Sequence, residues 1–234
     1  MKDQDSSAMP QNDKNHQFVS RGGIKLQAAI ENFKLKIANL TALDVGSSTG
    51  GFVDCLLQNG AGKVYSVDTC YGELAWKLRN DPKVVVMERT NILHLDHLPE
   101  RVIARSPPAG GRRSNLVWVN KIATLPLVAR NDKEQLDLIT IDAGWTKLEL
   151  VLPVVKKFLK PNGIIIALLK PQYEADKKDL RKGILLPEKA EEVKDQVLGR
   201  IKNLKFKIKN YIESPILGGG GNKEFLIYFS SLLI

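Results

Sequence analysis

Short apolar runs recur along the chain and are separated by longer segments of mixed polarity. The runs that predict strands span residues 42–46, 63–68, 83–87, 136–142 and 163–169. Segments that predict helices lie between most of these runs, at 51–58, 73–79 and 148–158. Strands that alternate with helices favour right-handed βαβ units and a parallel sheet. Because helices then cover both faces of the sheet, its strands can be nearly continuous apolar runs, as these are.

The N-terminal part has a different pattern. Residues 1–17 are almost entirely polar, and we expect a disordered tail there because they offer too little apolar surface to offset the entropy of ordering. Leu26, Ile30 and Phe33 then follow the i, i+4, i+7 spacing of an amphipathic helix that precedes the sheet. One domain over residues 18–234 is therefore expected.

The C-terminal part predicts the last strands of the sheet. A Lys-rich helix near 187–201 is followed by two β-rich runs, 206–214 and 224–234, with a glycine-rich turn at 218–221 between them. This pattern predicts a terminal antiparallel hairpin. Added to the five earlier strands, the hairpin gives an α/β, Rossmann-like fold with a mostly parallel seven-stranded sheet.

One segment interrupts the alternation. Residues 101–135 join the third and fourth predicted strands, and an unstructured connection of that length is unusual in a compact domain. The segment holds 7 basic and 2 acidic side chains. We interpret it as a basic insertion within the domain.

Charge favours a polyanionic partner. The chain has 35 Lys and Arg against 26 Asp and Glu, which leaves a net charge of +9. Residues 156–210 alone hold 15 basic and 7 acidic side chains. Such an excess suits a nucleic acid, although solvated lysine faces that maintain solubility would give the same count.

Apolar runs and cysteines indicate the cellular setting. The longest wholly apolar run, 163–169, is far shorter than the roughly 20 residues of a membrane-spanning helix. Cys55 and Cys70 cannot make a disulfide framework, and no apolar segment follows Met1 to suggest a secretory signal. We therefore expect a cytoplasmic protein without a membrane partner.

The first predicted strand runs directly into a glycine turn that opens a helix. From Asp44 to Phe52 the sequence reads DVGSSTGGF. In the dinucleotide fingerprint the second glycine lets the backbone approach a pyrophosphate, but counted from Gly46 that position holds Ser48. A phosphate-cradling P-loop is also disfavoured, because Phe and Val follow Gly51 where Lys and Ser or Thr are needed.

A nucleoside cofactor without phosphates remains. Asp68 ends the second strand, 22 residues after Gly46, where a carboxylate can accept both ribose hydroxyls. Thr90 and Asn91 follow the third strand at the same sheet edge, where an Asn side chain could read an adenine amino group. S-adenosylmethionine satisfies this set, although any single glycine turn or strand-end Asp could serve only to shape the backbone. The expected cofactor-binding residues are Asp44, Gly46, Ser47, Ser48, Gly50, Gly51, Phe52, Asp68, Thr90, Asn91 and Asp142.

Five blocks of sequence in one order extend this interpretation. They are SRGGIKL (20–26), LDVGSSTGGFVDCLLQNGA (43–61), VYSVDTCYGELAWKLRNDPKVVVMERTNI (64–92), LLKPQYEA (168–175) and GNKEFLIY (221–228). Together they resemble the TlyA, or hemolysin A, family, which is similar to the FtsJ group of ribose 2′-O methyltransferases. The resemblance covers most of residues 18–230 apart from the insertion. It implies a class I S-adenosylmethionine-dependent methyltransferase fold and methylation of ribosomal RNA.

The resemblance also implies a catalytic tetrad of Lys25, Asp142, Lys170 and Glu224. Methyl transfer to a ribose hydroxyl is an in-line displacement at a sulfonium carbon, so the enzyme must align the oxygen and help to remove its proton. A lysine can accept that proton only when neutral, a state that burial and a neighbouring cation favour. Lys170, at the end of a buried strand, is therefore the expected general base. Taken singly, Lys25 and Glu224 could be exposed charges, and Asp142 could cap a helix.

Several side chains are candidates for RNA contact. Phosphates would be tracked by arginines, and a splayed base would stack on a tryptophan unless that tryptophan is buried in the core. The candidates are Arg21, Arg105, Arg112, Arg113 and Trp145. No metal site is expected, because the three histidines lack a clear ligand set.

Two departures from the family pattern leave other functions open. Residues 1–17 cannot hold the S4-type RNA-binding domain that family members usually carry, so we expect substrate selection either to differ from that of the family or to rely on other surfaces. After Asp142 the chain has Ala-Gly-Trp-Thr where the family has an Asp-x-Ser-Phe-Ile-Ser type of stretch, which leaves the target nucleotide open. The alternatives are an RNA-binding protein that retains the fold without turnover and a membrane-active haemolysin. The lack of a spanning or long amphipathic apolar segment speaks against the haemolysin.

Overall fold

The computed structural model describes residues 17–99, 135–144, 146–204 and 206–230. The predicted N-terminal tail lies outside the described residues except for Gln17, and so does the predicted basic insertion except for its last residue, Gln135.

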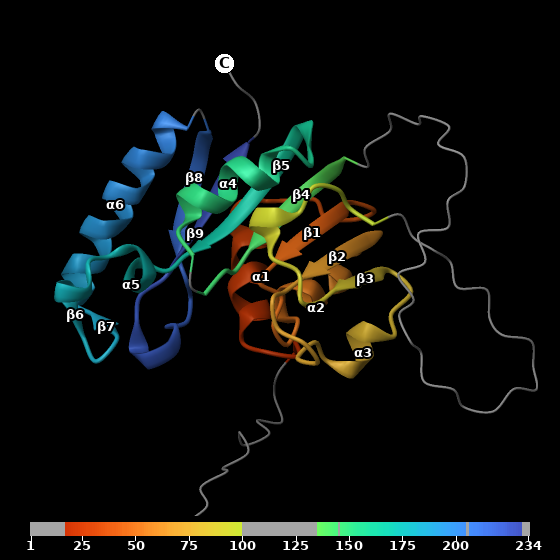
Figure 1. Cartoon of the computed structure of the whole chain (residues 1–234), viewed down its shortest axis with the longest axis horizontal. Coiled ribbons are helices and arrows are strands. Elements are labelled where there is room, and N and C mark those ends of the chain that lie inside the picture. The colour runs from red at the N-terminus through yellow and green to blue at the C-terminus, as the bar shows by residue number, and fades with distance from the viewer. Residues whose placement is uncertain (1–16, 100–134, 145, 205, 231–234) are drawn as a thin grey trace, which may run out of the picture.

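A seven-stranded sheet forms the centre of the molecule, in the order β3-β2-β1-β4-β5-β9-β8 (Figure 1). Its strands are β1 (Thr41–Val45), β2 (Lys63–Val67), β3 (Val84–Met87), β4 (Leu136–Ile141), β5 (Leu159–Leu169), β8 (Lys207–Glu213) and β9 (Phe225–Ser230). The first five strands are parallel, and β9 pairs antiparallel with both β5 and β8. The prediction of a mostly parallel seven-stranded sheet with a terminal antiparallel pair is confirmed.

A small second sheet was not predicted from the sequence. It consists of β6 (Leu180–Arg181) and β7 (Ile184–Leu185), which form a tight antiparallel hairpin. Both turn residues, Lys182 and Gly183, have positive φ angles (52° and 79°), as hairpin turns of two residues require. Strands of two residues are too short to leave an alternating apolar pattern in the sequence.

Helices cover both faces of the large sheet. They are α1 (Gly22–Asn32), α2 (Gly51–Gln58), α3 (Trp76–Arg79), α4 (Leu148–Lys156), α5 (Pro171–Glu174) and α6 (Pro187–Asn203), with 3-10 turns η1 (Ile92–His94), η2 (Lys177–Asp179) and η3 (Gly219–Gly221). Helix α3 is shorter than the predicted 73–79, because the chain is still extended at Ala75. Figure 1 shows α1 and α2 behind the sheet and α4 in front of it.

The core consists of two apolar layers, one on each face of the sheet. One layer includes Leu26 of α1 and Leu56 of α2, and the other includes Val151 of α4 and Val197 of α6. All four side chains are at most 1% exposed. Burial on both faces explains why the strands are nearly continuous apolar runs. Within the described ranges, no helix has the length and apolarity needed to cross a membrane.

The strand order brings distant residues to one edge of the sheet. Because β1 to β5 are parallel, the chain leaves each of them at the same edge, where Asp68, Asp142 and Lys170 directly follow their strands. Strand β9 runs the opposite way, and its first residue, Phe225, pairs with Leu169 at the end of β5. Glu224 therefore enters the same edge from the C-terminal part of the chain.

Candidate active site

The glycine turn after β1 packs tightly against the end of β4. Gly46 has a φ of +83°, and a Cβ atom added there would lie 2.7 Å from the carbonyl oxygen of Asp142. Only glycine combines this conformation with so close an approach. The amide N–H groups of Gly46 and Ser47 both donate to the carbonyl oxygen of Val67, which fixes the turn to the end of β2.

Asp68 holds the turn and the loop after β2 together. Its Oδ2 accepts the N–H of Ser48 at 2.7 Å, and its Oδ1 accepts the N–H of Cys70 at 2.8 Å. Among the described residues, each oxygen accepts one backbone N–H, whereas a carboxylate can accept about four hydrogen bonds. Acceptor sites on Asp68 therefore stay open for hydroxyl groups of a ligand.

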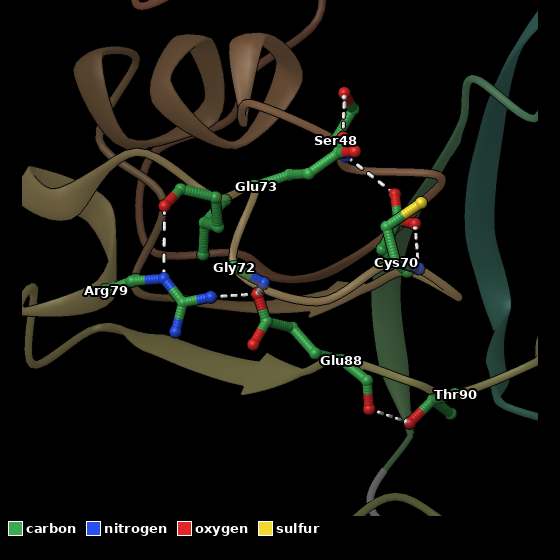
Figure 2. A network of polar contacts seen from close by, with 9 residues as sticks. Ser48, Cys70, Gly72, Glu73, Arg79, Glu88 and Thr90 are labelled. Atoms are coloured by element: carbon green, nitrogen blue, oxygen red, sulfur yellow. Dashed lines mark hydrogen bonds and ion pairs between the residues drawn. The ribbon is translucent and has the colours of Figure 1, made fainter.

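A polar network holds the loop between β2 and α3 in place (Figure 2). The hydroxyl of Ser48 donates to Glu73 at 3.1 Å, and Glu88 accepts the N–H of Gly72 at 2.8 Å. Arg79 forms an ion pair with Glu88 and donates from Nε to the carbonyl oxygen of Leu74 at 3.1 Å. These contacts hold the loop beside the glycine turn as one wall of the site.

A cavity of about 350 Å³ opens between these segments and the end of β4. Its lining residues are Val45, Gly46, Ser48, Val67, Asp68, Thr69, Cys70, Glu73, Thr90, Asn91, Ile92, Asp142, Ala143, Gly144, Thr146 and Lys170. The negative charges of Asp68 and Glu73 raise the pKa of the exposed Cys70 thiol. The wall of the cavity thus favours a positively charged ligand.

The predicted cofactor-binding residues divide into two groups. Those that line the cavity are Gly46, Ser48, Asp68, Thr90, Asn91 and Asp142. Those that do not line it are Asp44, Ser47, Gly50, Gly51 and Phe52, which belong to the end of β1, the glycine turn and the first turn of α2. Sequence reasoning missed Glu73 and Thr146, because they lie in irregular loops and belong to no spaced motif.

The cavity-facing residues after β3 are held by their own backbone contacts. The hydroxyl of Thr90 donates to the carbonyl oxygen of Glu88 at 3.0 Å, and the Asn91 Oδ1 accepts the N–H of Leu93 at 3.0 Å. The prediction that Asn91 reads an adenine amino group stays a prediction. One lone pair of its Oδ1 is left for such a contact.

Asp44 is a fully buried carboxyl group beneath the turn. Its Oδ1 accepts the hydroxyl of Thr140, the neighbouring residue on β4, at 2.6 Å. Its Oδ2 is buried without a hydrogen-bond partner among the described residues. Burial raises the pKa of Asp44 to about 7, and the charges of Asp142 and Asp68 act in the same direction.

The four predicted tetrad residues meet as two ion pairs. The Nζ atom of Lys170 lies 2.5 Å from Oδ1 of Asp142, and the Nζ atom of Lys25 lies 2.5 Å from Oε2 of Glu224. Lys25 and Glu224 are 8% and 2% exposed. The sequence alone could not exclude that they were surface charges, and their burial argues against that alternative.

The charges of the two ion pairs influence each other, so the four residues form one cluster. Burial raises the pKa of Asp142, while the positive charges of Lys170 and Lys25 oppose this shift and the negative charge of Glu224 adds to it. Gly218 packs directly against the carboxylate, since a Cβ atom added there would lie 2.0 Å from Oε1 of Glu224. The tetrad is therefore assembled from α1, the ends of β4 and β5, and the start of β9.

The structure places one of the predicted RNA-binding residues. Arg21 is exposed at the N-terminus of α1, about one helical turn before Lys25. Arg105, Arg112, Arg113 and Trp145 lie outside the described residues. In the part of the chain that the structure describes, no three His, Cys, Asp or Glu side chains form a group that could hold a metal ion.

A cavity at the carboxyl edge of a mostly parallel sheet, with an antiparallel β9 and with the Lys170–Asp142 pair in the cavity wall, is the arrangement of the S-adenosylmethionine-dependent methyltransferase fold. The model of the FtsJ-like methyltransferases matches residues 18–231. The chain belongs to this family. The predicted family relationship and class of fold are thereby confirmed.

Three comparisons show where the chain lies within the family. It is 38% identical over 216 residues to YqxC of Bacillus subtilis, which has a provisional rRNA methyltransferase name, and this match covers 90% of the chain and 65% of YqxC. It is 33% identical to the 16S/23S rRNA (cytidine-2′-O)-methyltransferase TlyA of Mycobacterium tuberculosis, over 92% of the chain and 69% of TlyA. A crystal structure from Lactococcus lactis, described provisionally as a hemolysin, is similar with a TM-score of 0.72 and 36% identity, over 92% of the chain and 89% of that structure.

Proposed function

We propose that this chain transfers a methyl group from S-adenosylmethionine to a ribose 2′-hydroxyl of RNA, with ribosomal RNA as the substrate. The observation that carries the proposal is the position of the Lys170–Asp142 pair, which lines the cavity and lies in the same cluster as Lys25 and Glu224. The rRNA methyltransferase names of YqxC and TlyA support the substrate.

The cavity fits the cofactor in size, charge and hydrogen bonding. Its volume of about 350 Å³ lies within the range of small-molecule sites. The carboxylates of Asp68 and Glu73 complement a cation, and Asp68 has acceptor sites left for two ribose hydroxyls. When bound, the cofactor would supply a methyl group that is attached to a positively charged sulfur. Loss of the methyl group would leave that sulfur as a neutral thioether.

The tetrad would handle the proton of the attacking hydroxyl. As the new carbon–oxygen bond forms, the hydroxyl proton would pass to Nζ of Lys170 acting as the general base, and Asp142, at 2.5 Å, would stabilise the resulting ammonium. Lys25, held by Glu224 at 2.5 Å, would help to keep the ribose and the Lys170–Asp142 pair in register. Arg21 is exposed at the N-terminus of α1, where it would contact a phosphate of the RNA.

Calorimetric titration of S-adenosylmethionine tests the cofactor site before any RNA is needed. We expect Asp68→Ala to weaken binding by roughly tenfold or more, because two ribose hydroxyls lose a charged acceptor. Asp81→Ala is the matched control, since Asp81 caps the turn before β3 and does not line the cavity. Absence of binding by the wild type would contradict the proposal.

Methyl incorporation tests the substrate. With labelled S-adenosylmethionine and ribosomal subunits or their naked RNA, we expect label in a nucleotide whose neighbouring phosphodiester bond resists alkali, as 2′-O-methylation requires. Cofactor binding without label in any ribosomal RNA would favour an RNA-binding protein that retains the fold without turnover.

A further inference from the structure

Glu174 is a buried carboxylate that the proposed mechanism does not use. It is the last residue of α5, the short helix that begins immediately after Lys170, and it is 8% exposed. Its Oε1 accepts the backbone N–H of Leu148 at 2.9 Å. Leu148 is the first residue of α4, and the preceding Lys147 provides no side-chain cap. Glu174 therefore caps α4 from another helix, at the end where the helix dipole favours a negative charge.

A third element is attached to the same carboxylate. Arg200 of α6 lies 3.4 Å from Oε2 of Glu174, and its Nε donates to Glu149 of α4 at 2.8 Å. Helices α4, α5 and α6 thus meet at one buried acidic group. Burial raises the pKa of Glu174, while the Leu148 N–H and the charge of Arg200 oppose that shift.

The location of this junction relates it to the cavity. The chain between Asp142 and Leu148 carries three residues of the cavity wall, Ala143, Gly144 and Thr146. At Asp142, where this segment begins, the Lys170–Asp142 ion pair joins it to Lys170. At Leu148, where it ends, the hydrogen bond to Glu174 joins it to α5, the helix that follows Lys170. Both ends of this wall are therefore anchored to the segment that carries the proposed general base.

We propose that Glu174 is a positioning residue, which fixes the wall formed by Ala143, Gly144 and Thr146 against Lys170 by capping α4. This inference rests on the proposed methyltransferase function. It predicts that loss of the cap loosens the wall and weakens cofactor binding, although Glu174 does not line the cavity.

Two substitutions separate the loss of the hydrogen-bond acceptor from the loss of the negative charge. Glu174→Ala removes the acceptor for the Leu148 N–H, whereas Glu174→Gln keeps an acceptor oxygen of the same reach. Glu192→Gln is the matched control, because Glu192 pairs with Lys189 on the exposed side of α6, away from the cavity.

We expect Glu174→Ala to raise the Kd for S-adenosylmethionine by roughly tenfold, as for the loss of a charged hydrogen bond, with the binding stoichiometry unchanged. Glu174→Gln should stay within about threefold of the wild type, and Glu192→Gln should match it. A purely structural role would instead lower the binding-competent fraction and leave the Kd of the remainder unchanged. That outcome, or equal Kd values for the Ala and Gln variants, would overturn the proposal.

Hydrogen exchange gives a readout that needs no cofactor. In the free protein, we expect the amides of residues 146–150 to exchange faster in Glu174→Ala than in Glu174→Gln or the wild type. Unchanged exchange in Glu174→Ala would overturn the positioning role. If faster exchange is seen but the wild type does not bind S-adenosylmethionine, the proposed function fails while the capping contact stands.

Discussion

The ammonium of Lys25 in α1 lies 2.5 Å from the carboxylate of Glu224, which is 199 positions later in the chain. Both side chains are buried, and the contact joins the first helix of the domain to the residue before β9. A buried charge is costly unless it is paired, so each residue is tolerated in the core because of the other.

A double-mutant cycle measures this interdependence. We expect Glu224→Gln or Lys25→Met to lower the free energy of unfolding by about 3 kcal/mol each, because each leaves one buried charge without its partner. The double variant should regain a large part of that loss. Urea denaturation of the four proteins supplies the coupling energy, and strictly additive losses would mean that the two charges do not depend on each other.

Gly218 offers a way to move Glu224 without changing its chemistry. A Cβ atom at Gly218 would lie 2.0 Å from Oε1 of Glu224, so Gly218→Ala must displace that carboxylate from Lys25. We expect methyl transfer to fall by roughly tenfold or more, as for other misplaced catalytic groups, while the Kd for S-adenosylmethionine changes little. Gly219→Ala is the control, because no atom lies within 4 Å of its added Cβ. Equal activity of the two variants would argue against a role for the position of Glu224.

Lys170 should be needed for chemistry more than for cofactor binding. With Lys170→Met, we expect the rate of methyl transfer to fall by about 100-fold or more, the usual effect of losing a general base. Lys160→Met is the matched control on the same strand, since Lys160 pairs with Asp137 near the amino end of β5. Single-turnover rates with saturating cofactor make the comparison, and full activity of Lys170→Met would exclude it as the base.

Asp44 should make the stability of the protein depend on pH. Its pKa is about 7 in the folded protein against an ordinary value of 3.8. Between these values the folded state binds more protons than the unfolded chain, so the free energy of unfolding falls as pH rises. Three pKa units correspond to about 4 kcal/mol.

Asp44→Asn tests this dependence, because the amide oxygen can still accept the Thr140 hydroxyl but carries no titrating proton. We expect the variant to lose less stability than the wild type between about pH 4 and about pH 8, as measured by urea denaturation. Asp81→Asn, at a turn away from the core, should keep the dependence of the wild type. Parallel curves for Asp44→Asn and the wild type would contradict the raised pKa.

The periodic parts of the fold could be predicted from the sequence. The five parallel strands have apolar runs long enough to be recognised, and the glycine turn after β1 is fixed by local conformation at Gly46. Helix α3 is shorter than the sequence predicts, and the β6–β7 hairpin was not predicted. Elements of two to four residues depend on tertiary contacts, which the sequence pattern does not show. The placement of β9 between β5 and β8 likewise depends on contacts distant in sequence.

The residues of the candidate site that lie in recognisable sequence motifs could be predicted from the sequence. Asp68 and Lys170 end apolar strands, so the sequence places them at one edge of the sheet. Glu174 and Glu73 have no such signal, because their partners belong to other loops and helices and become neighbours only in the folded chain. Residue type and spacing alone do not show that Glu174 is buried or that Glu73 lines the cavity.

The position of β9 also determines when the four-residue cluster can be completed during synthesis. A nascent chain that has emerged through β8 already holds Lys25, Asp142 and Lys170, and it contains the strands that bound the cofactor cavity. It lacks Glu224, and the edge of β5 that β9 will cover is still unpaired. The ribosome must therefore translate Glu224 and the adjoining β9 before the cluster of Lys25, Asp142, Lys170 and Glu224 can be complete.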